Sequence, residues 1–205
     1  MRDQGVFGEL SASQLLVSCS EVPRHEKPDG LPEAAYVLEH ARVPFISYPY
    51  EWSFQALKAA ALHHLDLQLL LFDRNVVLSD ASAYNIQFIG PRPVFIDALS
   101  LRPYVEGEIW GGHRQFCEQF LNPLLLRSVL GVSHNAWFRG SLEGIRTVDL
   151  ARLIPLRKKL SPSMLSHVVL QAYLENHAHR APDTAIAKAT GRRRLSRAGY
   201  RGLLM

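Results

Sequence analysis

Residues 80–97 read Asp80-Ala-Ser-Ala-Tyr-Asn85-Ile-Gln-Phe-Ile-Gly-Pro-Arg-Pro-Val-Phe-Ile-Asp97, and this stretch decides the fold expected for the chain. Two short apolar runs, 86–88 and 94–96, flank a turn at 90–93, which predicts two antiparallel strands joined by a tight turn. Such a hairpin places Asn85 and Asp97 at the same end, beside the loop that carries Asp80. Three oxygen-bearing side chains gathered there could hold Mg²⁺ against a phosphate chain and steer a hydroxyl toward it.

A long amphipathic helix is predicted just before this stretch, from about Ser53 to Phe72, with Ser53 as its N-cap. Apolar residues at three- and four-residue spacing form its expected buried face: Phe54, Leu57, Ala61, Leu65, Leu69 and Phe72. Residues 73–75 end the helix, and the β-branched pair Val76-Val77 leads as a short strand toward Asp80.

This order of helix, short strand, polar loop, hairpin and terminal Asp resembles the C-lobe of protein-kinase-like phosphotransferases. The resemblance implies that Asp80 is the catalytic base, which orients and deprotonates the acceptor hydroxyl. It further implies that Asn85 and Asp97 are metal ligands and that Asp97 bridges Mg²⁺ to the phosphates. The cofactors expected from the resemblance are therefore Mg²⁺ and ATP.

The chain also departs from the kinase pattern. Leu78-Ser79 stands where the family has His-Arg, and Ala98-Leu99 follows the metal-binding Asp in place of Phe-Gly. About fifty residues precede the long helix, too few for a complete N-lobe, and they contain neither a glycine-rich phosphate loop nor the strand Lys of the family. An alternative stays open, in which Asp80, Asn85 and Asp97 are only turn and capping residues.

A second resemblance covers more of the chain, from about Gly5 to His179. It is carried by Val43-Pro-Phe-Ile-Ser-Tyr-Pro-Tyr-Glu-Trp-Ser53, Asp80-Ala-Ser-Ala-Tyr-Asn-Ile-Gln-Phe88 and Arg114-Gln-Phe-Cys117. These segments are similar to a bacterial family in which such a region precedes a class I S-adenosylmethionine-dependent methyltransferase domain, in proteins labelled as methyltransferases or nodulation proteins. The resemblance implies a shortened relative or fragment, with a methyltransferase domain or chain as its partner.

Two hypotheses for function follow. The first is a kinase-like, ATP- and Mg²⁺-dependent phosphotransferase-related domain, degenerate if the missing parts are not supplied. The second is a non-catalytic module that positions a substrate or partner for a methyltransferase domain absent from this chain. Because no glycine-rich loop for S-adenosylmethionine follows a strand, we expect no S-adenosylmethionine site and no methyl transfer by this chain alone.

Composition limits the other possibilities. At 205 residues and 47% hydrophobic, the chain is long enough for one well-buried core. Cys19 and Cys117 lack metal-ligand spacing, so we expect reduced thiols, with Cys117 a buried, inert one. No apolar run reaches the roughly 18 residues of a membrane span, and no signal peptide opens the chain. These features predict a cytoplasmic protein.

The positive charge is concentrated at one end of the chain. Residues 180–205 hold seven basic residues and one acid, so residues 1–179 carry about −2 of the net +4. We predict three parts: a partial N-terminal segment with short strands at 1–52, a helical kinase-like C-lobe at 53–179, and a poorly ordered basic tail at 180–205. The fold class is α+β, mainly helical. No specific nucleic-acid partner is expected, because the body has no basic face.

Further helices are predicted at 110–130, with a kink at Pro123, and at 141–154 and 162–177. The adjacent pair His63 and His64 points to different sides of its helix, which indicates structural roles and not a metal pair. Arg114 and Gln115 have an open role. Their pairing with Glu106 or Glu108 would order the loop that follows the hairpin.

Overall fold

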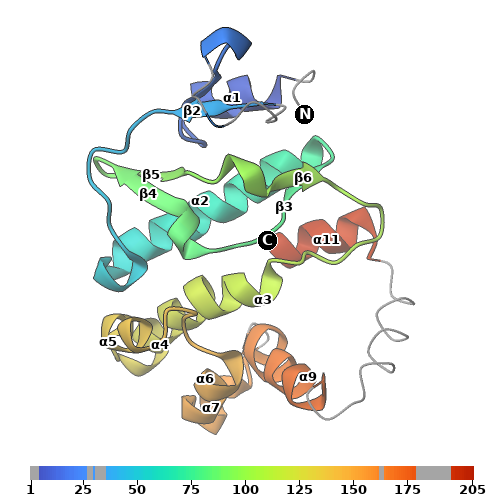
Figure 1. The fold of residues 1–205 in the computed structure, drawn as a ribbon. Coiled ribbons are helices and arrows are strands. Elements are labelled where there is room, and N and C mark those ends of the chain that lie inside the picture. The colour runs from blue at the N-terminus through green and yellow to red at the C-terminus, as the bar shows by residue number, and fades with distance from the viewer. Residues whose placement is uncertain (1–4, 27–29, 31–35, 162–163, 179–194) are drawn as a thin grey trace.

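The computed structural model describes residues 5–26, 30, 36–161, 164–178 and 195–205. This part of the chain is mixed α+β and mainly helical, which confirms the expected fold class. Its strands are short and form three two-stranded antiparallel pairs. Figure 1 shows α2 (Phe54–Asp73) crossing the middle of the molecule, between the N-terminal elements and the C-terminal helices.

The long helix forms as predicted. The Ser53 side chain caps it by accepting a hydrogen bond of 3.2 Å from the backbone N–H of Ala56. Its buried face is wider than the predicted stripe, because packing from both sides covers the helix. Leu65 and Leu69 of the predicted stripe are only half-buried. The residues covered most fully are Leu57, Ala60, Ala61, His63, His64, Leu67, Gln68, Leu71 and Phe72.

The predicted hairpin is also present. Strand β4 (Ile86–Ile89) pairs with β5 (Arg92–Phe95), with Ile86 opposite Phe95. Gly90 adopts φ 60°, the left-handed conformation that a tight turn requires and that glycine takes without strain. The strand expected after the long helix is β3 (Val76–Leu78), and its partner is β6 (Leu101–Pro103).

The N-terminal elements attach to the hairpin through its second strand. They are α1 (Val6–Ala12), β1 (Cys19–Glu21), the 3₁₀ turn η1 (Arg24–Glu26), β2 (Leu38–His40) and the 3₁₀ turn η2 (Pro49–Glu51). Backbone bonds from Val17 to the Phe95 carbonyl (2.7 Å) and from Phe95 to the Leu15 carbonyl (3.0 Å) make the attachment. The short strands expected in this segment form as β1 and β2, while residues 44–48 form a loop. The predicted boundary near residue 52 stays a prediction.

The helix expected at 110–130 is divided. It consists of α3 (His113–Phe116), a π-helical segment η5 (Cys117–Leu121) and α4 (Asn122–Leu130). Proline has no N–H for the helical ladder, and a wide turn, closed by the bond from the Asn122 N–H to the Cys117 carbonyl, lies just before Pro123. The kink at Pro123 stays a prediction.

The remaining helices build a second, smaller core. They are α5 (His134–Gly140), α6 (Thr147–Leu153), α7 (Leu156–Lys159), the π-helical η6 (Leu165–Val169) and α9 (Leu170–Ala178). The helix predicted at 141–154 begins only at Thr147. The second core consists of Leu126, Ile145, Leu150, Ile154, Met164 and Val168. The main core, around α2, contains 25 buried residues of the described part of the chain.

The C-terminal end differs from the predicted tail. Helix α11 (Arg197–Leu204) packs on α2, and its Tyr200 is fully buried, stacked on Phe72 with ring centroids 4.4 Å apart. Gln68 donates a hydrogen bond of 2.8 Å to the Tyr200 hydroxyl. Residues 195–205 are therefore part of the fold, because an aromatic and a leucine at helical spacing outweigh the surrounding arginines. Most of the predicted tail, 180–194, lies outside the described residues.

Candidate functional site

Asp80, Asn85 and Asp97 come together in the structure, as the hairpin geometry predicts. The side-chain Nδ2 of Asn85 donates hydrogen bonds to Asp80 Oδ1 (2.9 Å) and to Asp97 Oδ2 (3.2 Å). One amide nitrogen thus bridges two carboxylates, and all three side chains are half-buried. We call this group the acid–amide cluster.

The local fold explains why these three residues meet. Asp80 follows β3, Asn85 ends the 3₁₀ turn η3 (Ala83–Asn85) before β4, and Asp97 follows β5 before η4 (Ala98–Ser100). A backbone bond from Ile96 to the Asn85 carbonyl (2.8 Å) closes this end of the hairpin. A second bond, from Ser79 to the Ser100 carbonyl (2.7 Å), ties the Asp80 loop to the segment after Asp97.

Two glutamines hold the loop of Asp80 in place: Gln115, whose role the sequence left open, and Gln119, which the sequence did not single out. Gln115 Oε1 accepts a hydrogen bond from the Ala81 N–H, and Gln119 Oε1 accepts one from the Ala83 N–H, each at 2.8 Å. The pair is four residues apart and so shares one helix face, a signal that the sequence does contain. Gly112 lies so close to Ala81 that a Cβ there would approach the Ala81 Cβ to 2.9 Å.

The pairing expected for Arg114 and Gln115 is wrong. Arg114 pairs with Glu118, one turn further along the helix, at 3.5 Å. Glu108 pairs with Arg102 at 3.0 Å. Gln115 faces the Asp80 loop, so it orders the segment before the hairpin and not the segment after it.

Electrostatics make Asp80 the unusual carboxyl of the cluster. Burial raises its pKa above the ordinary value, and the neighbouring charge of Asp97 raises it further. Hydrogen bonds from the Ser82 backbone and from Asn85 act in the opposite direction. The ionised cluster is therefore strained by the repulsion between its own carboxylates, and a bound cation would relieve that repulsion.

Each carboxylate also has a local backbone partner. Asp97 Oδ1 accepts a hydrogen bond of 3.1 Å from the Leu99 N–H, and Asp80 accepts one from the Ser82 N–H. The turn and capping roles left open by the sequence are thus real. Both carboxylates nevertheless meet at one point, because each also accepts a hydrogen bond from Asn85.

The donor set suits a hard cation more than a transition metal. Two carboxylates and an amide provide oxygen ligands of the kind that Mg²⁺ takes together with water and phosphate oxygens. Among the described residues no group of three or more His, Cys, Asp or Glu side chains has an arrangement for holding a metal. The acid–amide cluster is of another kind, because its third member is an asparagine.

The described hollows of the surface lie elsewhere. One, of about 480 Å³, lies between the end of α1 and the hairpin and has Gln14 and Arg92 on its wall. Another, of about 300 Å³, lies beside α2 and is mostly apolar, with Lys58 at its edge. Asp80, Asn85 and Asp97 do not line either of these two hollows.

The other candidates are structural, as expected. His63 Nε2 lies 2.9 Å from the Leu15 carbonyl oxygen, and His64 is fully buried. Cys117 is buried as well, and burial raises the pKa of its thiol to about 12, so it is not a nucleophile at neutral pH.

Comparison with known proteins supplies one relative. The chain is 50% identical over 171 residues to nodulation protein NoeA of Rhizobium meliloti strain 1021. The match takes in 83% of this chain but only 36% of that protein. No family model matches, and no solved structure does. The likeness to part of a bacterial nodulation protein is thereby confirmed. Within the described residues, no helix has the length and apolar character needed to cross a membrane.

Proposed function

We propose that this chain is a kinase-like module whose acid–amide cluster binds Mg²⁺ and takes part in phosphoryl transfer from ATP. The observation that carries the proposal is the bridge from Asn85 Nδ2 to the two carboxylates. This bridge gathers one amide and two acidic side chains at a single point, at the end of a hairpin that follows a long helix.

Each residue of the cluster has a distinct proposed role. Asn85 and Asp97 are the metal ligands. Among the hydrogen bonds of the described residues the Asn85 amide uses only its nitrogen, so its oxygen is available to a cation. Asp80 is the base: it accepts the proton of an acceptor hydroxyl as that oxygen bonds to the γ-phosphorus of ATP and the bond to ADP breaks. Because its pKa is raised, this carboxylate is a stronger base than an ordinary aspartate.

A non-catalytic role is the second candidate. The N-terminal residues lack the phosphate loop and the lysine of kinases, and the matched region is a minor part of the nodulation protein. On this reading the module positions a substrate or partner for a methyltransferase domain supplied by another region or chain. The cation would then be structural, bound without nucleotide.

Calorimetric titration separates these readings. Mg²⁺ and then Mg-ATP are titrated into the wild-type chain and into Asp97→Asn, Asp80→Asn and the matched control Asp66→Asn, which changes an exposed carboxylate on α2. We expect cation and nucleotide binding in the wild type and the control, and loss of both in Asp97→Asn. Asp80→Asn should keep nucleotide binding but lose phosphoryl transfer.

The possible outcomes favour different conclusions. Cation binding without nucleotide binding would support the positioning module over the phosphotransferase. No cation binding in the wild type, or equal binding in all four proteins, would contradict both roles and leave the cluster as a turn.

A further inference from the structure

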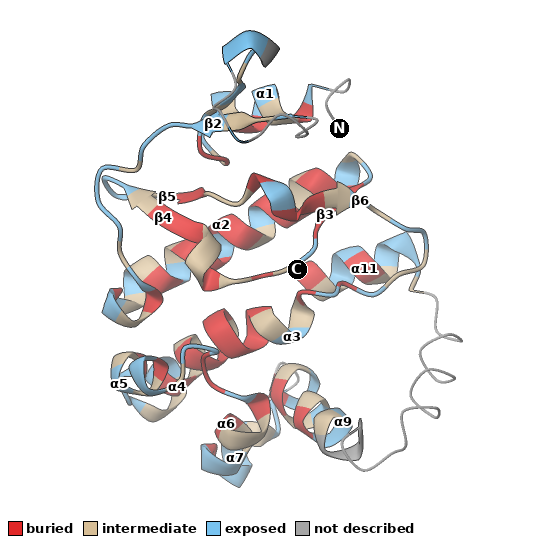
Figure 2. Cartoon of the chain, in the orientation of Figure 1, coloured by how far each residue is buried: buried red, intermediate tan, exposed pale blue. Residues whose placement is uncertain are grey.

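The corner between α6 and α7 exposes large apolar side chains beside basic ones. Leu156 is 80% exposed, Leu160 is 69% exposed and Leu153 is also exposed. We call this surface the basic leucine tip, which consists of Leu153, Leu156, Leu160, Arg152, Arg157, Lys158 and Lys159. Figure 2 shows α7 largely in the colour of exposed residues, at the end of the molecule away from α1.

The tip is built on a fixed base. Ile154, just before α7, is buried in the second core, and Pro155 starts the short helix. Leu156 and Leu160 are four residues apart, so they lie on one face of this single turn. Lys158 Nζ donates a hydrogen bond of 2.6 Å to the Val129 carbonyl, which ties α7 to the end of α4. The exposed leucines are thus held outward by anchored backbone.

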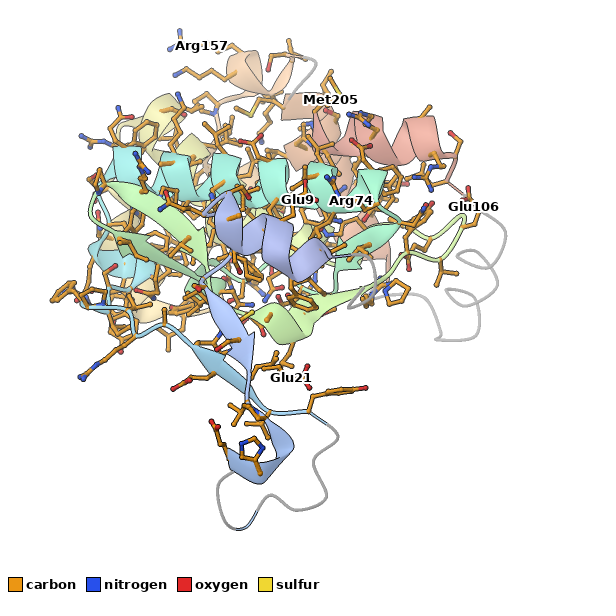
Figure 3. All side chains as sticks on the ribbon, turned by 90° about the horizontal axis from the view of Figure 1, so that it is seen from above. Glu9, Glu21, Arg74, Glu106, Arg157 and Met205 are labelled. Carbon is orange, nitrogen blue, oxygen red and sulfur yellow. The ribbon has the colours of Figure 1, made fainter. Side chains whose placement is uncertain are left out.

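The charge around the tip has one sign. Residues 150–161 contain four basic residues and no acid. Asp149 pairs with Arg146 (2.8 Å) and with Arg152 (3.5 Å), so that acid is already occupied. Figure 3 shows Arg157 at the edge of the molecule. Arg157 and Lys159 have no acidic partner among the described residues.

We propose that the basic leucine tip docks on an anionic membrane surface. Leucines on a short turn can enter the boundary between headgroups and acyl chains, and neighbouring cations are attracted to anionic headgroups. Protein interfaces, by contrast, are depleted in lysine, and the described part of this tip has two lysines between its most exposed leucines. Such docking is peripheral and needs no spanning helix.

Vesicle flotation tests the proposal on the full chain. The vesicles are phosphatidylcholine alone, or phosphatidylcholine with about one part in three of phosphatidylserine. We expect the chain to float with the anionic vesicles and not with the neutral ones, and to be released as salt rises, because surface charges are screened.

Two variants and a control assign the binding to the tip. Leu156→Ser with Leu160→Ser should weaken the partition coefficient by about tenfold or more, since two apolar side chains no longer enter the lipid. Arg157→Gln with Lys159→Gln should weaken it by about 25-fold, at about fivefold for each cation. Lys158 is left unchanged because it holds α7. The control, Lys58→Gln with Leu62→Ser, changes an exposed lysine and leucine on α2 and should bind as the wild type does.

Three outcomes would overturn the proposal. The first is no flotation with anionic vesicles. The second is flotation that the tip variants and the control weaken equally, which would place the contact elsewhere on the chain. The third is association of the chain with itself, lost in the leucine variant and independent of lipid, which would make the tip a protein interface. A circular dichroism spectrum and melting temperature like those of the wild type would show that each variant is folded.

Discussion

The main core and the second core differ in how many of the large apolar side chains around them are buried. Around α2, 25 buried residues of the described chain pack together, from the N-terminal helix to Tyr200 of the C-terminal helix. The second core has six buried residues within the described ranges. In the same region more large apolar residues are exposed than buried: Leu142, Leu153, Leu156, Leu160, Leu165, Leu170, Tyr173 and Leu174.

The two cores therefore support different features of the molecule: the acid–amide cluster and the exposed leucines. The acid–amide cluster stands on the main core, because the loop of Asp80 leaves β3 and is held by Gln115 and Gln119. The second core has exposed leucines beside it and holds none of the three site residues. We infer that the two regions carry separate tasks, one chemical and one concerned with attachment.

Leucine-to-alanine changes in the two cores should show most directly whether the cores differ in packing. Leu71 and Leu150 are each fully buried, one in each core. We expect Leu71→Ala to lower the free energy of unfolding by about 4 kcal/mol and Leu150→Ala by about 2 kcal/mol, because the smaller core can collapse around the missing atoms. Urea unfolding measures both. Equal losses would show that the second core is as tightly packed as the main one.

The joint between the two regions depends on Gly144. This residue has φ 89°, and a Cβ added there would overlap the Glu118 carbonyl oxygen of η5. Gly144→Ala should therefore cost about 3 kcal/mol, from the strained backbone and from displacement of the 141–146 loop. Gly140→Ala is the matched control, since an added Cβ meets nothing within 4 Å there. Equal melting temperatures for the two variants would contradict the close approach.

The buried His64 should make the main core sensitive to acid. Its ring lies among Phe95, Trp110, Phe116 and Phe120, and neither ring nitrogen has a hydrogen-bond partner among the residues that the structure describes. Burial lowers its pKa to about 3, so below pH 6.5 the unfolded chain binds a proton that the folded chain does not. Stability is then lost as the pH falls, by about 2 kcal/mol at pH 5.

His64→Phe should remove that loss while keeping the aromatic packing. Urea unfolding of both proteins at pH 7 and pH 5 measures the effect. The wild type should lose about 2 kcal/mol more than the variant between these two pH values. The same pH dependence in both proteins would mean that His64 is not the group responsible.

The acid–amide cluster should show the smallest effect, and one of opposite sign. Because the pKa of Asp80 is raised, its ionised form destabilises the fold above the pH at which an ordinary Asp ionises. Asp80→Asn should therefore stabilise the chain at pH 7, by less than about 1 kcal/mol given its solvent exposure. Thermal melting without metal measures the change, and a clear loss of stability would show that Asp80 is mainly a turn residue.

Much of the site region could be predicted from local pattern. Ser53 marked the helix start, Gly90 the turn, and the spacing from Asn85 to Asp97 placed both at one end of a hairpin. Each of these signals acts over a few residues, so the sequence alone was sufficient. The bridge through Asn85 follows from the same short-range geometry.

What the sequence missed depends on contacts between distant segments. Gln119 contacts the Asp80 loop from 36 residues away, and Gln68 reaches Tyr200 across 132 residues. The arginines around Tyr200 indicate a poorly ordered tail. In the structure Tyr200 is buried against Phe72, and this contact holds the C-terminal helix in the fold. The exposed leucines likewise follow the helical pattern of buried ones, and only the fold shows which are covered.

Counting bound Mn²⁺ by electron paramagnetic resonance tests the central claim most directly, with Mn²⁺ as the probe for the oxygen site. The account predicts saturable binding that Mg²⁺ displaces, that Asp97→Asn abolishes, and that the control Asp66→Asn retains. Mn²⁺ binding that is absent in the wild type, or unchanged in Asp97→Asn, would contradict a cation site at Asp80, Asn85 and Asp97.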